Sequence, residues 1–167
     1  MGDRIYTRID VLRKYVDEML LQNNNDNERR CGYVHLYGVG MAAAFLALKR
    51  GFDPELAEMA GILHDYISYQ GFDGSDHAHR CEPVVRDLLN KIAVTTAEET
   101  DMICSAVYNH SDKDKIDSDF DEIIKDADAM QHWLRNPKEP LFREFNRVRK
   151  LCDDFNLDYS LCVNNRK

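Results

Sequence analysis

The stretch Met59-Ala-Gly-Ile-Leu-His-Asp-Tyr66 decides the fold of this chain. It begins as an apolar helix and ends in the polar pair His64-Asp65, whose side chains would otherwise face a core without partners. Burying an unpartnered carboxylate is costly, so such a group needs a cation or strong hydrogen-bond donors. A metal ion meets this need, because neutral imidazole and carboxylate are both good ligands. The stretch therefore predicts a helical core that contains a metal site.

Helix signals continue on both sides of this stretch and predict an all-α fold. Asp53-Pro54 is an N-cap followed by proline, Thr96 with Glu99 forms a capping-box pattern, and Gly51 is a typical helix stop. No segment alternates polar and apolar residues as a strand does. We expect one bundle of about six to seven helices spanning 1–167. The expected helices are about 7–21, 33–50, 54–66, 78–92, 97–110, 119–134 and 141–156, with loops at 23–30, 70–75 and 111–118 and a frayed tail at 157–167.

The composition is globular and acidic. The chain has 167 residues, with 22 Lys and Arg against 30 Asp and Glu, giving a formal net charge of −8. Duplex nucleic acid and anionic membranes are therefore not expected as partners. The N-terminal residues do not resemble a signal peptide, and the longest run of apolar residues and glycine, 39–48, is too short to span a bilayer. Five cysteines without a CxxC pair suit buried thiols in a reducing cytoplasm.

His35 and Asp128 are the residues expected to join the His-Asp pair. His35 is surrounded by apolar and aromatic residues in the segment 33–37. Asp128 follows the apolar residues Ile124 and Ala127 by four residues and by one, which favours an inward face. Four ligands on three helices can converge in the core of a bundle.

In order, His35, His64-Asp65 and Asp128 resemble the signature H…HD…D of the HD superfamily of metal-dependent phosphohydrolases. Small and apolar residues precede the His-Asp pair, and the Asp-Ala-Asp segment that ends at Asp128 resembles the D-A-D motif of that family. The resemblance covers about residues 33–134. It implies an HD-type bundle in which these four residues bind a divalent cation (Mn²⁺, Fe²⁺, Zn²⁺ or Mg²⁺), with Asp126 as the alternative to Asp128.

Two further histidines match positions of the resembled family. His77 precedes a helix, and His110 follows the fifth expected helix. In dinuclear relatives these positions bind a second metal, bridged to the first through the aspartate of the His-Asp pair. In mononuclear relatives similar residues contact the substrate phosphate. The number of bound metal ions, one or two, therefore remains undecided. His79 and His132 are expected at the surface.

The chain departs from the family at two positions that often carry a cation. Many relatives have arginine three residues after the first histidine, where this chain has Gly38, and a basic residue after D-A-D, where it has Ala129. Other basic residues either take over the phosphate contact or are solvated surface charges, and the surface reading is favoured for Lys113 in its charged run. These residues are Arg29, Arg30, Lys113 and Lys125.

The resemblance implies hydrolysis of a phosphomonoester or nucleotide, a small anionic substrate, by a metal-bound water of lowered pKa. Asp65, His77 and His110 are the predicted catalytic groups, Asp65 as a ligand and the histidines as groups that offset charge. Three alternatives stay open: a di-iron oxygenase that needs both histidines as ligands, a metal-stabilised binding module without turnover, and a bundle whose His and Asp make only core hydrogen bonds. The sequence leaves the substrate, the native metal and the oligomeric state undetermined.

Overall fold

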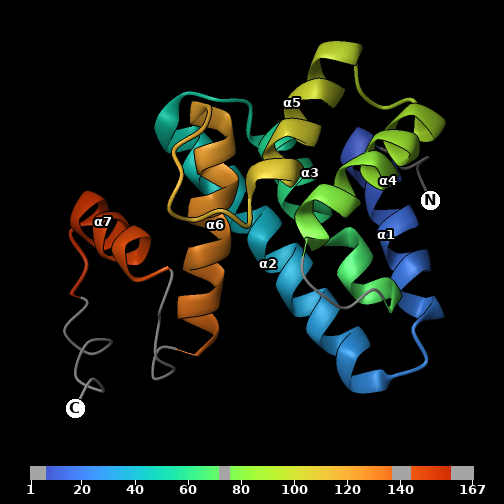
Figure 1. Ribbon diagram of the computed structural model, residues 1–167, viewed down its shortest axis with the longest axis horizontal. Coiled ribbons are helices and arrows are strands. Elements are labelled where there is room, and N and C mark those ends of the chain that lie inside the picture. Colours follow the sequence, from blue (N-terminus) through green and yellow to red (C-terminus); the bar gives the residue numbers. More distant parts are fainter. Residues whose placement is uncertain (1–6, 72–75, 137–143, 159–167) are drawn as a thin grey trace, which may run out of the picture.

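The computed structural model describes residues 7–71, 76–136 and 144–158, and the regular secondary structure within these ranges is all helical. This confirms the all-α prediction. The elements, labelled in Figure 1, are α1 (Arg8–Gln22), α2 (Asp26–Arg50), α3 (Pro54–Leu63), the 3₁₀ helix η1 (Tyr66–Gln70), α4 (His77–Ile92), α5 (Ala97–Asn109), α6 (Asp119–Arg135) and α7 (Phe145–Phe155).

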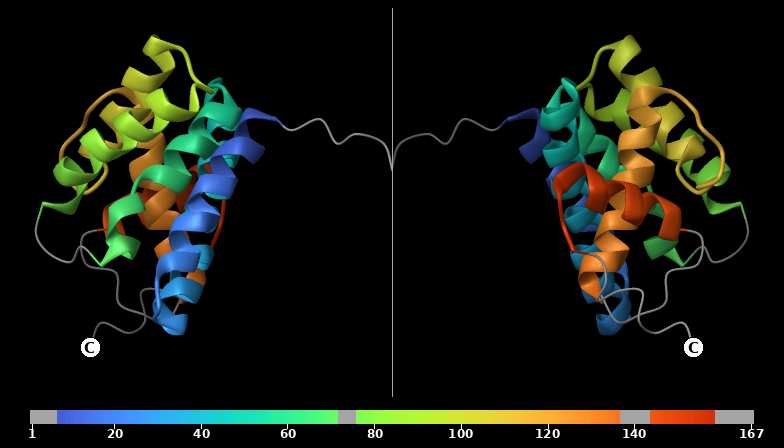
Figure 2. Two further views of the ribbon diagram at one scale, coloured as in Figure 1. Left: turned by 90° about the vertical axis from the view of Figure 1, so that its right-hand side faces the viewer. Right: turned by 90° about the vertical axis from the view of Figure 1, so that its left-hand side faces the viewer.

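Helix α2 runs through the middle of the bundle and packs against α3 and α6 (Figure 1). Helices α4 and α5 pack on each other, and α5 also contacts α3 and α6. The two side views in Figure 2 show α1 along one side of the bundle and α7 on the opposite side, against α6. The ends of α3 and α5 and the middle of α2 and α6 consequently face one another in the interior.

Most helix ends lie where the sequence placed them. Asp53 caps α3 by accepting from two backbone N–H groups, with Pro54 as the first helical residue. Thr96 and Glu99 form the reciprocal capping box of α5. Gly51 ends α2 in the left-handed region, at φ 78°, which glycine adopts without strain.

Helix α2 begins seven residues earlier than expected, so the predicted loop at 23–30 is wrong for most of its length. The Asn25 side chain caps the helix by accepting from the backbone N–H groups of Asn27 and Glu28. Asp26 and Glu28 in the first turn also suit the positive end of the helix dipole. Capping and charge therefore extend the helix through a segment that has no apolar stripe.

The third expected helix, 54–66, is divided in the structure. The apolar helix α3 ends at Leu63, and the shorter 3₁₀ helix η1 follows the His-Asp pair.

Two other expected segments fall partly outside the described ranges. The expected loop at 70–75 lies largely outside the described residues. The last helix begins at Phe145 rather than at 141, since residue 144 precedes it as its cap; residues 141–143 and the expected tail from 159 are outside the described ranges.

Among the described helices, α2 is the one whose length and composition would allow it to cross a membrane. It packs against α1, α3 and α6, and it carries buried His35 into the interior. In this bundle α2 is therefore a core helix. The absence of a membrane partner stays a prediction.

The contact between α2 and α3 depends on two facing glycines. A Cβ atom on Gly61 would lie 2.8 Å from Gly40 Cα and 2.9 Å from Val39 O, and both are backbone atoms. Backbone atoms cannot move aside as a flexible side chain can, so the two helices approach each other at a distance that only glycine permits. His64 follows Gly61 by three residues, and this contact therefore helps to fix its position.

We expect Gly61→Ala to lower the free energy of unfolding by about 1–3 kcal/mol through overpacking. Helix propensity alone would instead raise stability by up to about 1 kcal/mol. Urea denaturation followed by circular dichroism measures the sign of the change. A stabilised Gly61→Ala protein would show that α2 and α3 are not in close backbone contact.

Candidate metal centre

The four residues predicted as ligands converge in the interior. His35 Nε2 lies 3.1 Å from His64 Nε2, 3.4 Å from Asp65 Oδ2 and 3.6 Å from Asp128 Oδ1. His64 Nε2 lies 3.5 Å and 3.8 Å from the same two carboxylate oxygens. His35, His64 and Asp128 are buried, and Asp65 is mostly covered. The geometry therefore brings together two imidazoles and two carboxylates from three helices and the turn after α3.

The two additional histidines meet on the other oxygen of Asp65. His77 Nε2 lies 3.2 Å from Asp65 Oδ1 and 3.1 Å from His110 Nε2, and His110 Nε2 lies 3.4 Å from Asp65 Oδ1. Asp65 thus stands between two groups of possible ligands, one on each of its oxygens. Either group has the spacing that could hold a metal ion.

Two of the histidines occupy the same position at the end of a helix. His64 is the C-cap of α3, and His110 is the C-cap of α5. Each Nδ1 bonds back to a carbonyl three residues earlier, His64 to Gly61 O at 2.8 Å and His110 to Val107 O at 2.7 Å. A carbonyl oxygen only accepts, so Nδ1 carries the proton and the Nε2 lone pair faces the cluster.

His35 is oriented by a side chain on α6. Its Nδ1 donates to Gln131 Oε1 at 2.8 Å, and Gln131 Nε2 donates in turn to Val34 O. His35 Nε2 is therefore also an acceptor that faces the cluster. Such a partner on the second ring nitrogen is the usual arrangement around a metal-binding histidine.

Gln131→Leu removes the oxygen that accepts from His35 Nδ1. We expect it to weaken metal binding by about 10–100-fold, because His35 loses its fixed tautomer and ring orientation. Competition with a chromogenic chelator measures the affinity. The matched change Gln22→Leu, on α1, is expected to leave it unchanged. Equal affinities in both variants would exclude this role for Gln131.

The charges of the cluster call for a cation at its centre. Asp128 Oδ1 is buried without a hydrogen-bond partner, and the Nε2 lone pairs of His35 and His64 face each other. Burial raises the pKa of Asp128, but Lys113 and the imidazoles outweigh this effect and hold the pKa well below its usual value. Burial lowers the pKa of His64 to about 3, which keeps the ring neutral. Neutral imidazoles and ionised carboxylates are the donor set of a borderline divalent cation.

Lys113 is part of this interior, so its expected place at the surface is wrong. The loop after α5 folds back and buries its side chain. Lys113 Nζ donates to Asp128 Oδ2 at 2.5 Å and to His110 O at 2.8 Å. Lys113 therefore neutralises one oxygen of Asp128 and leaves the other directed at the cluster.

The remaining basic candidates lie away from the cluster. Lys125 is fully buried and pairs with Asp117, so it is neither a surface charge nor a phosphate contact. Arg29 and Arg30 bond to nearby side chains at the start of α2, as expected of surface residues. Ala129 packs in a small apolar cluster with Trp133. A cation at that position would point into this cluster.

His132 lies at the edge of the metal centre, where its side chain is 36% exposed, so the prediction of a surface residue missed its contact with the cluster. Its Nε2 is 3.5 Å from Asp128 Oδ1, and its ring stacks on His35 with centroids 5.0 Å apart. Its Nδ1 is 3.6 Å from Glu144 Oε1. His132 follows Asp128 by four residues on α6, so helical spacing already placed the two on one face.

Asp126, the alternative ligand, is held elsewhere. Its carboxylate accepts from Arg50 at 2.6 Å and from Arg147 at 2.8 Å. The structure thus brings Asp128, and not Asp126, to the cluster. His79 is exposed beside Asp76 and stacks on Tyr108, as expected for a surface residue.

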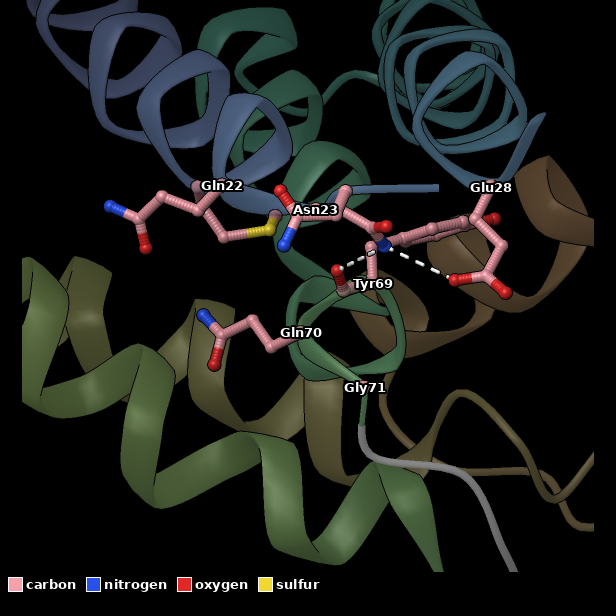
Figure 3. A pocket seen from close by; sticks show the side chains of 8 residues that line it. Gln22, Asn23, Glu28, Tyr69, Gln70 and Gly71 are labelled. Atoms are coloured by element: carbon pink, nitrogen blue, oxygen red, sulfur yellow. Dashed lines mark hydrogen bonds between the residues drawn. The ribbon is translucent and has the colours of Figure 1, made fainter. Parts of the chain in front are cut away.

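A polar pocket of about 510 Å³ lies beside the cluster, between the α1–α2 turn and η1 (Figure 3). Carboxamide side chains dominate its lining, and Asn23 donates to Glu28 and to the carbonyl of Tyr69. Tyr69 connects it to the metal centre, because its ring centroid is 6.4 Å from that of His35. No residue of the cluster itself lines this pocket.

The fold and the site together define a class of protein: an all-helical domain with a buried centre of imidazoles and carboxylates. A family model of the HD domain matches residues 32–133, more than half of the chain. The chain belongs to the HD domain family. This assignment supports a metal-dependent hydrolase at the level of the superfamily.

A solved structure shares the fold. It is that of a predicted HD superfamily hydrolase from an uncultured Thermotogales bacterium, with a TM-score of 0.60 and 17% identity over 86% of this chain and 88% of that chain. At this identity the similarity supports the fold alone. A comparison with curated proteins gives no match.

Proposed function

We propose that this protein is a metal-dependent phosphohydrolase that acts on a phosphomonoester or nucleotide. One observation carries the proposal: Asp65 directs one oxygen at His35 and His64, beside Asp128, and the other at the second pair of imidazoles. The first group would hold one divalent cation (Mn²⁺, Fe²⁺, Zn²⁺ or Mg²⁺). Asp65, His77 and His110 would hold a second.

A bound divalent cation lowers the pKa of water and stabilises negative charge on a phosphoryl oxygen. Asp65 orients both groups, because each of its oxygens faces a different pair of imidazoles. His110 is buried, whereas the His77 side chain is 34% exposed, the most accessible of the six residues. Burial lowers the pKa of His77, which keeps its imidazole neutral. With two cations this imidazole would be a ligand, and with one cation it would instead be able to accept a proton from the attacking water.

The proposed substrate is small and anionic, and the proposed compartment is the cytoplasm. A net charge of −8 disfavours duplex nucleic acid and anionic membranes, whereas a cationic centre attracts a phosphate locally. Elemental analysis of the purified protein, combined with a screen of nucleotides and sugar phosphates, tests the proposal. One or two divalent ions per chain with hydrolysis of a phosphoester are expected.

A di-iron oxygenase is the second candidate, and two observations favour it. His77 and His110 do complete a six-residue set around Asp65. In addition, Gly38 lies against Gln131, and Ala129 is in an apolar cluster, so neither position supplies a cation for phosphate. Two irons per chain with consumption of O₂ would support the oxygenase. An intact metal content without any turnover would support a binding module.

A further inference from the structure

A stripe of polar side chains leads outward from the metal centre along α6. Asp128, His132 and Arg135 are separated by four and three residues, which places them on one face of the helix. The His132 side chain is 36% exposed at the edge of the cluster, one turn beyond Asp128. Arg135 is exposed in the last turn of α6. Arg135 is therefore the solvent-facing cation of this stripe.

Arg135 forms no ion pair with any described residue, whereas Lys113, the other cation near Asp128, is committed to that carboxylate. Long side chains on a helix lean toward its N-terminus, a direction that favours a guanidinium position near His132. Within the described ranges, the guanidinium of Arg135 is therefore open to a ligand.

Tyr69, on η1, also lies beside the metal centre. Its ring lies beside His35, with 6.4 Å between the centroids. Burial and then Asp65 raise the pKa of the Tyr69 hydroxyl to about 12, while Arg135 acts in the opposite direction. The carboxylate of Asp65 and the guanidinium of Arg135 therefore both lie close enough to Tyr69 to act on its hydroxyl.

We propose that His132 and Arg135 form an anion subsite that binds a second phosphoryl group of the substrate, next to the phosphoryl group at the metal centre. This inference rests on the proposed phosphohydrolase function and narrows its substrates to compounds with adjacent phosphoryl groups, such as nucleoside di- and triphosphates. Asp128 and Arg135 are seven residues apart, about 10 Å along the helix axis. A ligand longer than one phosphoryl group is needed to engage both, and a guanidinium can bind phosphate through two parallel hydrogen bonds.

Binding of inorganic pyrophosphate and of inorganic phosphate to the metal-loaded, desalted protein tests the subsite without turnover. Titration calorimetry is expected to show pyrophosphate binding at least about tenfold more tightly than phosphate, the ratio that corresponds to about 1.4 kcal/mol. Arg135→Gln is expected to abolish this preference. Lys14→Gln, which removes the same charge from the exposed face of α1, is expected to retain it.

His132→Ala separates a subsite from a metal ligand. We expect its metal content to equal that of the wild type and its affinity for pyrophosphate to fall by about tenfold, the loss of one charge-assisted hydrogen bond. Two results would overturn the proposal: loss of metal in His132→Ala, or equal pyrophosphate affinities in Arg135→Gln and Lys14→Gln. The phosphoester screen reports on the proposed function separately. If pyrophosphate binding depends on Arg135 but no phosphoester is hydrolysed, the hydrolase is refuted and the subsite is retained. If a phosphoester is hydrolysed but binding does not depend on Arg135, the subsite is refuted and the hydrolase is retained.

Discussion

Asp65→Ala is expected to remove nearly all bound metal and to lower phosphoester turnover by more than about 10³-fold. The physical reason is that Asp65 faces both groups of imidazoles, through Oδ2 on one side and Oδ1 on the other. Its loss removes a ligand from each group at once. Elemental analysis and initial-rate measurements on the same preparation give both quantities.

Two control variants make this result specific. Asp87→Ala removes an exposed carboxylate from α4 and is expected to change neither metal content nor turnover. Asp126→Asn alters the carboxylate held by Arg50 and Arg147 and is expected to keep the metal. Circular dichroism confirms that each variant is folded. Normal metal content in Asp65→Ala would refute the proposed centre and leave a bundle with ordinary core hydrogen bonds.

Lys113→Met is expected to destabilise the metal-free protein by about 3–5 kcal/mol, because Asp128 would then be a buried charge without its partner. A divalent cation takes over the neutralisation of Asp128, so the loss should shrink when metal is present. Urea unfolding in chelator and in saturating Mn²⁺ or Zn²⁺ measures both free energies.

The exposed Lys150→Met on α7 serves as the control and is expected to be neutral under both conditions. A difference between Lys113→Met and wild type that is the same with and without metal would show that the cation does not contact Asp128. The experiment therefore reports on the position of the ion as well as on the role of Lys113.

The helices were predictable because their ends carry strong local signals. Asp53-Pro54, Thr96 with Glu99, and Gly51 act within one turn of the chain, where sequence and conformation are directly connected. The start of α2 was missed because the prediction followed apolar periodicity, and residues 26–30 have none. The pattern Asn25-x-x-Glu28 was the available signal.

The centre itself was predictable only through the ordered motif. Spacing along the chain does not show that His35 and Asp128, 93 residues apart, meet at 3.6 Å. The expectation that these residues meet came from the resemblance to the HD superfamily. For His132, the spacing of four residues from Asp128, itself a predicted ligand, was an available signal that the prediction did not use.

Lys113 shows where local reasoning fails. Its neighbours Asp112 and Asp114 are typical of a solvated loop, and nothing nearby in the sequence indicates burial. The cause is long-range: the loop returns over α6, where Asp128 needs a counter-charge. Burial of a charged side chain is decided by the partner that tertiary structure provides, and that partner is distant in sequence.

The hydrogen bonds from His64 to Gly61 O and from His110 to Val107 O give these rings a second task. The last carbonyls of a helix have no partner within it, and each ring occupies one of them. Replacing either histidine therefore removes a helix C-terminal cap as well as a metal ligand, so loss of activity in such a variant has two causes. A substitution that still donates to the carbonyl, such as asparagine, separates the contribution to architecture from the contribution to chemistry.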